Sequence, residues 1–145
     1  MILLIIEKMK RNKTLLFTIN KKGHSKENPD LLRIICSPEY TKIDFGYTAK
    51  SKYESGGWIR MEKSTYIEII ETKERLVLTS TSGIPINPEY HYFESTKDWR
   101  YFSLFFPPIS QKDCSLNIIE KENGTKNDFN YYDVSLNMAD GVEVV

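Results

Sequence analysis

Histidine is the side chain that most often acts as a general base near neutral pH, and the sequence contains two of them. His24 lies in the polar segment 21–30, where a solvated side chain is the simpler explanation. His91 lies between Tyr90 and Tyr92, so on a strand it faces outward if both tyrosines face inward. No serine elbow or other nucleophile motif accompanies His91. We therefore predict that the protein is not an enzyme, and a small hydrolase with His91 as base is the least favoured of three functions.

The side chains that could hold a metal are few and badly spaced. Cys36 and Cys114, together with the two histidines, would suffice for one zinc ion, but no C-x-x-C or H-x-x-x-H spacing occurs. Glu120 and Glu122 share a face if they lie on a strand, which would suit calcium or glycosidic chemistry. Lys121 between them and the turn that follows favour a solvated strand end instead. The sequence therefore predicts no metal and no cofactor, and it leaves open whether the two cysteines pair.

The aromatic stretch WRYFSLFF at 99–106 is the most distinctive constellation. The alternation of a strand puts Phe102, Leu104 and Phe106 on one face and Trp99, Tyr101, Ser103 and Phe105 on the other. The first face is typical of a core, whereas the second is too apolar for an ordinary wetted face. We favour a second face covered by the N-terminal segment or a loop, because large aromatic side chains usually bury. The alternative is an exposed aromatic surface for a sugar ring or a partner protein.

Net charge and hydropathy argue against a nucleic-acid partner and against a transmembrane segment. Lysine and arginine number 20 among the 145 residues, as do aspartate and glutamate, so the net charge is zero. Binding to a nucleic-acid backbone needs a positive excess, so no nucleic-acid partner is expected. No apolar run approaches the roughly 18 residues of a transmembrane helix, so no transmembrane segment is expected. The segment from Met9 has a basic start, but its apolar stretch is too short for a clean signal peptide.

Short apolar segments separated by turn residues predict an all-β fold without a convincing helix. TKIDFGYTA at 41–49 alternates most clearly. Turn signals recur at the spacing of roughly 8–12 residues that is typical of sandwiches. We predict an antiparallel β-sandwich of about seven to nine strands over 30–136, preceded by a leader and possible edge strand over 1–29 and followed by a tail over 137–145. Strands are expected at 14–20, 31–37, 41–49, 58–62, 65–70, 74–81, 90–93, 99–106, 115–122 and 129–136. The predicted core comprises Ile34, Ile43, Phe45, Tyr47, Ile67, Ile69, Leu76, Leu78, Phe102, Leu104, Phe106, Ile118, Phe129 and Tyr131.

Four segments of the second half carry a resemblance: GIPINPEYHYF, WRYFSLFFPPIS, LNIIEKEN and FNYYDVSL. Together with YTKIDFGY and GGWI, they resemble uncharacterised bacterial immunoglobulin-like β-sandwich accessory modules. The resemblance implies a non-catalytic role and an extracytoplasmic location, in the periplasm or at the cell surface. The chain departs from antibody-type domains, because Lys112 stands two residues before Cys114 where those domains have tyrosine. No inter-sheet disulfide is therefore inferred.

The leading functional hypothesis is a non-catalytic interaction or accessory module of unknown ligand, with a protein or a glycan as partner. The alternative is a carbohydrate-binding module that uses the aromatic strand face. That alternative requires solvent-exposed and roughly coplanar rings. The candidate binding residues are Trp99, Tyr101, Phe105, Trp58 and His91.

Overall fold

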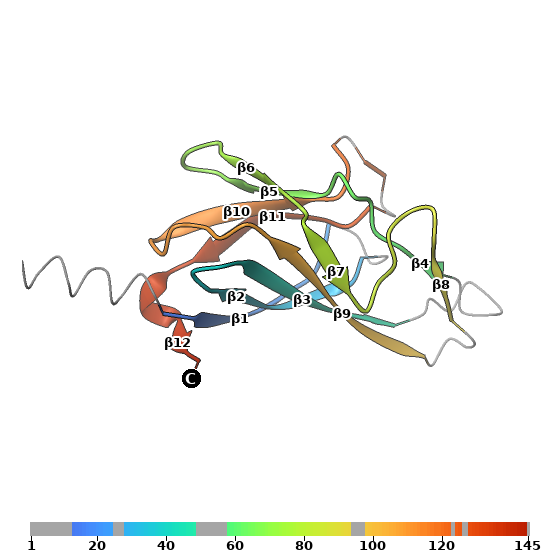
Figure 1. Cartoon of the computed structure of the whole chain (residues 1–145), viewed down its shortest axis with the longest axis horizontal. Coiled ribbons are helices and arrows are strands. Elements are labelled where there is room, and N and C mark those ends of the chain that lie inside the picture. Colours follow the sequence, from blue (N-terminus) through green and yellow to red (C-terminus); the bar gives the residue numbers. More distant parts are fainter. Residues whose placement is uncertain are drawn as a thin grey trace, which may run out of the picture.

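The chain folds into two antiparallel β-sheets that face each other across a common core (Figure 1). The computed structural model describes residues 13–24, 28–48, 58–93, 98–122, 124–125 and 128–144. Apart from one short 3-10 helix, η1 (Met138–Asp140), the regular secondary structure of these residues is β-strand. The expected all-β class with antiparallel sheets is confirmed.

The larger sheet has six strands. In spatial order they are β12 (Val142–Glu143), β1 (Leu15–Lys21), β2 (Asp30–Cys36), β3 (Thr41–Thr48), β9 (Trp99–Phe106) and β7 (Ser80–Ser82). β1 falls in the segment for which a possible edge strand was predicted; it lies inside the sheet, because β12 pairs with its other side, Leu16 opposite Val142. The segment expected as a tail thus supplies η1 and the edge strand β12.

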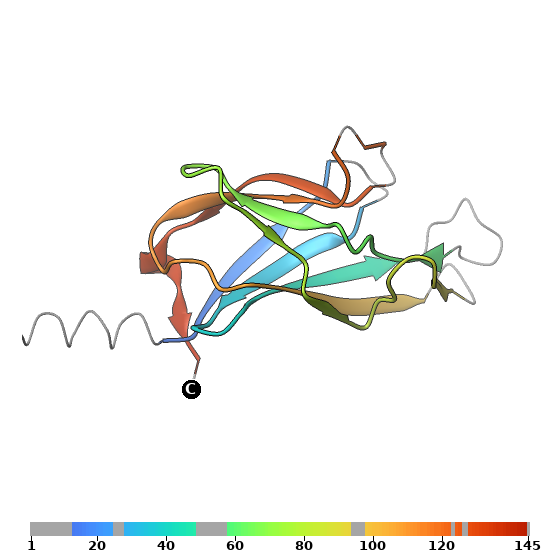
Figure 2. The same cartoon turned by 45° about the horizontal axis from the view of Figure 1, so that its top comes forward.

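The second sheet has four strands and lies over the first, as the turned view makes clear (Figure 2). Its order is β11 (Asn130–Leu136), β10 (Cys114–Ile119), β5 (Tyr66–Ile69) and β6 (Arg75–Val77). A separate two-stranded sheet, β4 (Trp58–Ile59) with β8 (His91–Tyr92), lies at one end of the molecule (Figure 1).

The single strand expected over 74–81 is wrong, because the chain changes sheets within it. The backbone N–H of Leu78 donates to Thr65 O beside the four-stranded sheet, 2.8 Å away. The next N–H, that of Thr79, donates to Phe105 O of β9, also at 2.8 Å. The segment therefore divides into β6 and β7, one in each sheet. With the short strands β4, β8 and β12, this division brings the described part of the chain to twelve strands.

The core lies between the two sheets and contains the residues that alternation predicted. Eleven of the fourteen predicted core residues are buried, and Ile69, Leu76 and Leu78 are partly buried against them. Phe45 of β3 stacks on Phe102 of β9 with ring centroids 5.0 Å apart, and it contacts Tyr131 of the opposite sheet at 5.3 Å. These rings define the inward face of β3 and β9, so the residues that alternate with them along each strand face outward.

Within the residues the structure describes, no helix is long and apolar enough to cross a membrane.

Candidate functional site

The candidate site lies on the outer face of the six-stranded sheet, the face turned away from the four-stranded sheet. β3 and β9 pair without interruption, so that Asp44 lies opposite Ser103 and Gly46 opposite Tyr101. On the other side of β3, a register shift between Leu31 and Arg33 brings Arg33 opposite Asp44. A polar row, Arg33–Asp44–Ser103, thus crosses three strands next to the aromatic end of β9.

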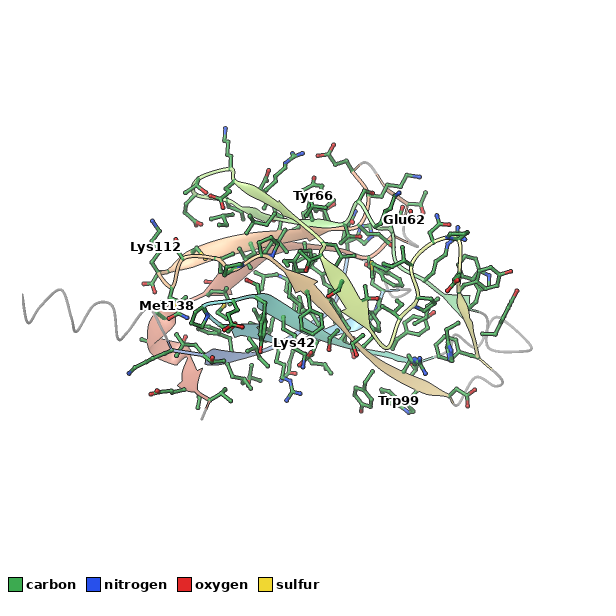
Figure 3. All side chains as sticks on the ribbon, in the orientation of Figure 1. Lys42, Glu62, Tyr66, Trp99, Lys112 and Met138 are labelled. Carbon is green, nitrogen blue, oxygen red and sulfur yellow. The ribbon has the colours of Figure 1, made fainter. Side chains whose placement is uncertain are left out.

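Trp99 and Tyr101 are exposed on this outer face. Their exposed fractions are 62% and 68%, their ring centroids are 6.1 Å apart, and their planes differ by 13°. Trp99 points away from the four-stranded sheet (Figure 3). The expectation that this face is covered is wrong for both rings. The physical reason is that both rings lie on the face turned away from the four-stranded sheet, and β7 lies beside β9 in the same sheet, where it extends the sheet sideways and does not cover this face.

Phe105, the third aromatic residue of the outer face, is half-buried. Tyr40 covers it edge-on, with ring centroids 5.8 Å apart and planes at 70°. Phe105 is therefore packed by its own chain and does not extend the exposed pair, which we call the Trp99–Tyr101 platform.

A groove runs beside this platform, and Gly46 gives it depth. A Cβ atom at Gly46 would lie 3.4 Å from Leu32 Cδ1 and 3.6 Å from Tyr101 Cε1, so the missing side chain leaves room between those two residues. The groove has a volume of about 350 Å³, and its lining includes Leu32, Arg33, Lys42, Asp44, Tyr101 and Ser103.

Asp44 is the polar centre of the groove and is only 7% exposed. Its Oδ2 accepts a hydrogen bond from Arg33 Nε at 2.5 Å, and its Oδ1 accepts one from Ser103 Oγ at 2.6 Å. Lys42 Nζ lies 3.5 Å from Oδ1. Burial alone would raise the pKa of Asp44, but the hydrogen bonds from Ser103 and Arg33 and the charges of Lys42 and Arg33 together lower it. The carboxylate is therefore ionised at neutral pH and is held by groups of the protein.

Trp58 belongs to a different aromatic surface, on the sheet of β4 and β8. Its ring centroid is 5.3 Å from that of Tyr90, which in turn contacts Tyr92 edge-on at 4.7 Å. The guanidinium of Arg60 lies 5.0 Å from the centroid of Trp58. All three rings are exposed. We call this set, Trp58, Arg60, Tyr90 and Tyr92, the end cluster.

His91 lies on the other face of β8 from the exposed tyrosines, so they point outward and the histidine points toward the interior. Its ring packs edge-on against buried Phe93, with centroids 5.0 Å apart. Burial, followed by the charge of Arg100, lowers the pKa of His91, and the charge of Asp98 opposes this. The described residues form no hydrogen bond between His91 and a nucleophile or a carboxylate, so this arrangement gives the hydrolase hypothesis no support.

Cys36 and Cys114 are free thiols on different sheets. Burial raises the pKa of Cys36 to about 12, and the charge of Cys114 adds to this. Within the described ranges, no group of three or more His, Cys, Asp or Glu side chains could hold a metal ion.

Glu120 is buried rather than solvated, and the sequence analysis missed this. Its Oε1 accepts the N–H of Phe129 at 2.8 Å and its Oε2 accepts that of Glu62 at 3.2 Å. Burial raises its pKa to about 7, although both backbone hydrogen bonds act in the opposite direction. Glu122 does lie at the surface, where Arg75 and Tyr66 contact it.

Comparison of the chain with protein-family models, with curated proteins and with solved structures gives no match.

Proposed function

We propose that the protein is a non-catalytic binding module whose ligand is a carbohydrate, held on the Trp99–Tyr101 platform. The observation that carries this proposal is the pair of exposed, nearly parallel rings, 62% and 68% accessible, on one strand face. The C–H groups on one side of a pyranose ring form an apolar surface that packs against an aromatic face. Contiguous exposed apolar surface of this kind is typical of ligand-binding and partner-binding sites.

The polar row beside the platform supports the same conclusion. Ligand sites combine apolar contact area with a few fixed polar groups that set orientation. Ser103 and Arg33 are fixed by hydrogen bonds to Asp44, so their remaining hydrogen-bonding capacity is pre-positioned for sugar hydroxyls.

The experiment is affinity electrophoresis of the purified chain through gels that contain soluble neutral and acidic polysaccharides. Trp99→Ala and Tyr101→Ala should each weaken binding by about 5- to 30-fold, because truncation of an aromatic anchor costs about 1–2 kcal/mol. Tyr132→Ala is the matched control, since Tyr132 is an exposed tyrosine on the other sheet. The proposal is overturned if no polysaccharide retards the protein, or if retardation survives both platform variants.

A protein partner is the second candidate, and the end cluster favours it. Tryptophan, tyrosine and arginine are the residues enriched at protein-binding hot spots, and this cluster presents all three together. Trp58→Ala should then abolish capture of that partner while leaving polysaccharide retardation unchanged. An equal loss of both activities would show that the two surfaces serve one ligand.

The immunoglobulin-like arrangement and the extracytoplasmic location are further parts of the proposal. Two antiparallel sheets around one core support the first. The sequence resemblance alone supports the second.

A further inference from the structure

The groove beside the platform contains more positive than negative charge. Arg33 and Lys42 both pair with Asp44, and one carboxylate cannot balance two cations. Among the described residues that line the groove, Arg33, Lys42 and Asp44 are the only acidic or basic side chains. A ligand in the groove therefore meets a surplus of one positive charge next to an aromatic wall.

Arg33 is arranged so that part of its guanidinium can reach a ligand. Its Nε is bonded to Asp44, which fixes the plane of the group, and its side chain is 52% exposed. Neither of its terminal amino groups donates a hydrogen bond to a residue in the described part of the chain. Two parallel N–H donors on a fixed plane match the two oxygens of a carboxylate.

We infer that the sugar bound on the platform carries a carboxylate, as in a uronic acid residue of an acidic polysaccharide. The sugar ring packs on Tyr101, and the carboxylate enters the groove to meet Arg33 and Lys42. Charge complementarity argues for this ligand over a neutral sugar, and the planar fork of arginine matches the two oxygens of a carboxylate. The inference rests on the proposed carbohydrate function, which it makes specific.

The test compares each of three acidic polysaccharides, polygalacturonate, alginate and hyaluronate, with its own methyl ester. Esterification removes the charge and leaves the backbone unchanged. At least one acid should bind about tenfold more tightly than its ester, and this preference should weaken with added salt. Arg33→Gln should abolish the preference, as should Lys42→Gln. Arg75→Gln is the matched control, because Arg75 is also 52% exposed and also pairs through Nε with a carboxylate, that of Glu68 on the other sheet.

Four outcomes separate the specific inference from the general proposal. An acid preference lost in Arg33→Gln and kept in Arg75→Gln supports the inference. Equal binding of every acid and its ester, still dependent on Trp99 and Tyr101, overturns the inference and leaves the carbohydrate function intact. Dextran sulfate binding as tightly as the best acid overturns the carboxylate assignment. Binding that is unchanged in Trp99→Ala and Tyr101→Ala overturns both.

Arg33→Lys is the alternative variant if Arg33→Gln unfolds. It keeps the charge beside Asp44 and removes the planar fork, so the preference for the acid should still fall.

Discussion

Glu120 makes the stability of this fold depend on pH in an unusual direction. The carboxyl group is only 7% exposed and lies near the charges of Asp128 and Glu62. Burial and these charges destabilise its ionised form by more than its two backbone hydrogen bonds stabilise it. Its pKa in the folded chain is about 7, against 4.5 for the ordinary group. Between those pH values the unfolded chain loses its proton while the folded chain keeps it.

The sign follows from proton linkage. The folded state binds more protons in this window, so the free energy of unfolding falls as pH rises. The contribution of Glu120 is fully present below pH 4.5 and is lost as pH rises through about 7. A shift of this size, at about 1.4 kcal/mol for each pH unit, amounts to about 3 kcal/mol. Glu120→Gln removes the titration, so the difference in unfolding free energy between variant and wild type should rise by about 3 kcal/mol from pH 4.5 to pH 8.

Urea unfolding followed by circular dichroism across pH 4.5–8 measures this difference. The absolute stability of Glu120→Gln also reflects one altered hydrogen bond, but that term does not vary with pH. Glu71→Gln is the control, because Glu71 is at the surface and the Ser115 N–H lowers its pKa, so its contribution is lost only in acid. A difference between Glu120→Gln and wild type that stays flat over the range would refute the argument.

Two further predictions follow from the backbone and the buried thiol. Gly83 has φ +83°, and an added Cβ would lie 2.6 Å from Tyr101 O. Gly83→Ala should therefore destabilise the fold by about 1–3 kcal/mol, as measured by urea unfolding. An unchanged unfolding midpoint would contradict this. Burial raises the pKa of Cys36 to about 12. At pH 8 this thiol should therefore resist iodoacetamide in the folded protein and react only after unfolding. Mass spectrometry of the labelled peptides measures the difference. Rapid labelling of Cys36 in the folded chain would contradict the buried position.

Strand positions and inward faces could be predicted from the sequence because they depend on local alternation. The inward triplet Phe102, Leu104 and Phe106 of β9 is buried as expected. Whether the opposite face is covered depends on whether a segment distant in sequence packs on it, as Tyr40 does on Phe105. No local pattern contains that information, so the exposure of Trp99 and Tyr101 was predicted wrongly.

Glu120 shows the same limit for a polar residue. The partners that bury it, Glu62 and Phe129, lie 58 and 9 residues away in sequence. An acidic residue just after a strand, followed by a lysine, is typical of a solvated end. Glu120 becomes a buried hydrogen-bond acceptor because the segments that contain Glu62 and Phe129 pack against it. No local pattern in the sequence indicates that these three segments meet.

The groove is assembled by the pairing of strands and not by residues at a fixed spacing along the chain. Arg33 meets Asp44 because one residue is accommodated between Leu31 and Arg33 in the β2–β3 register. Tyr101 lies over the space at Gly46 because the β3–β9 register is continuous. The end of β9 is held in turn by Arg100 Nε, which donates to Gly83 O at 2.6 Å beside the point where Gly83 approaches Tyr101 O. Cross-strand register, rather than spacing along the chain, thus brings the aromatic pair, the two cations and the fixed carboxylate into one surface.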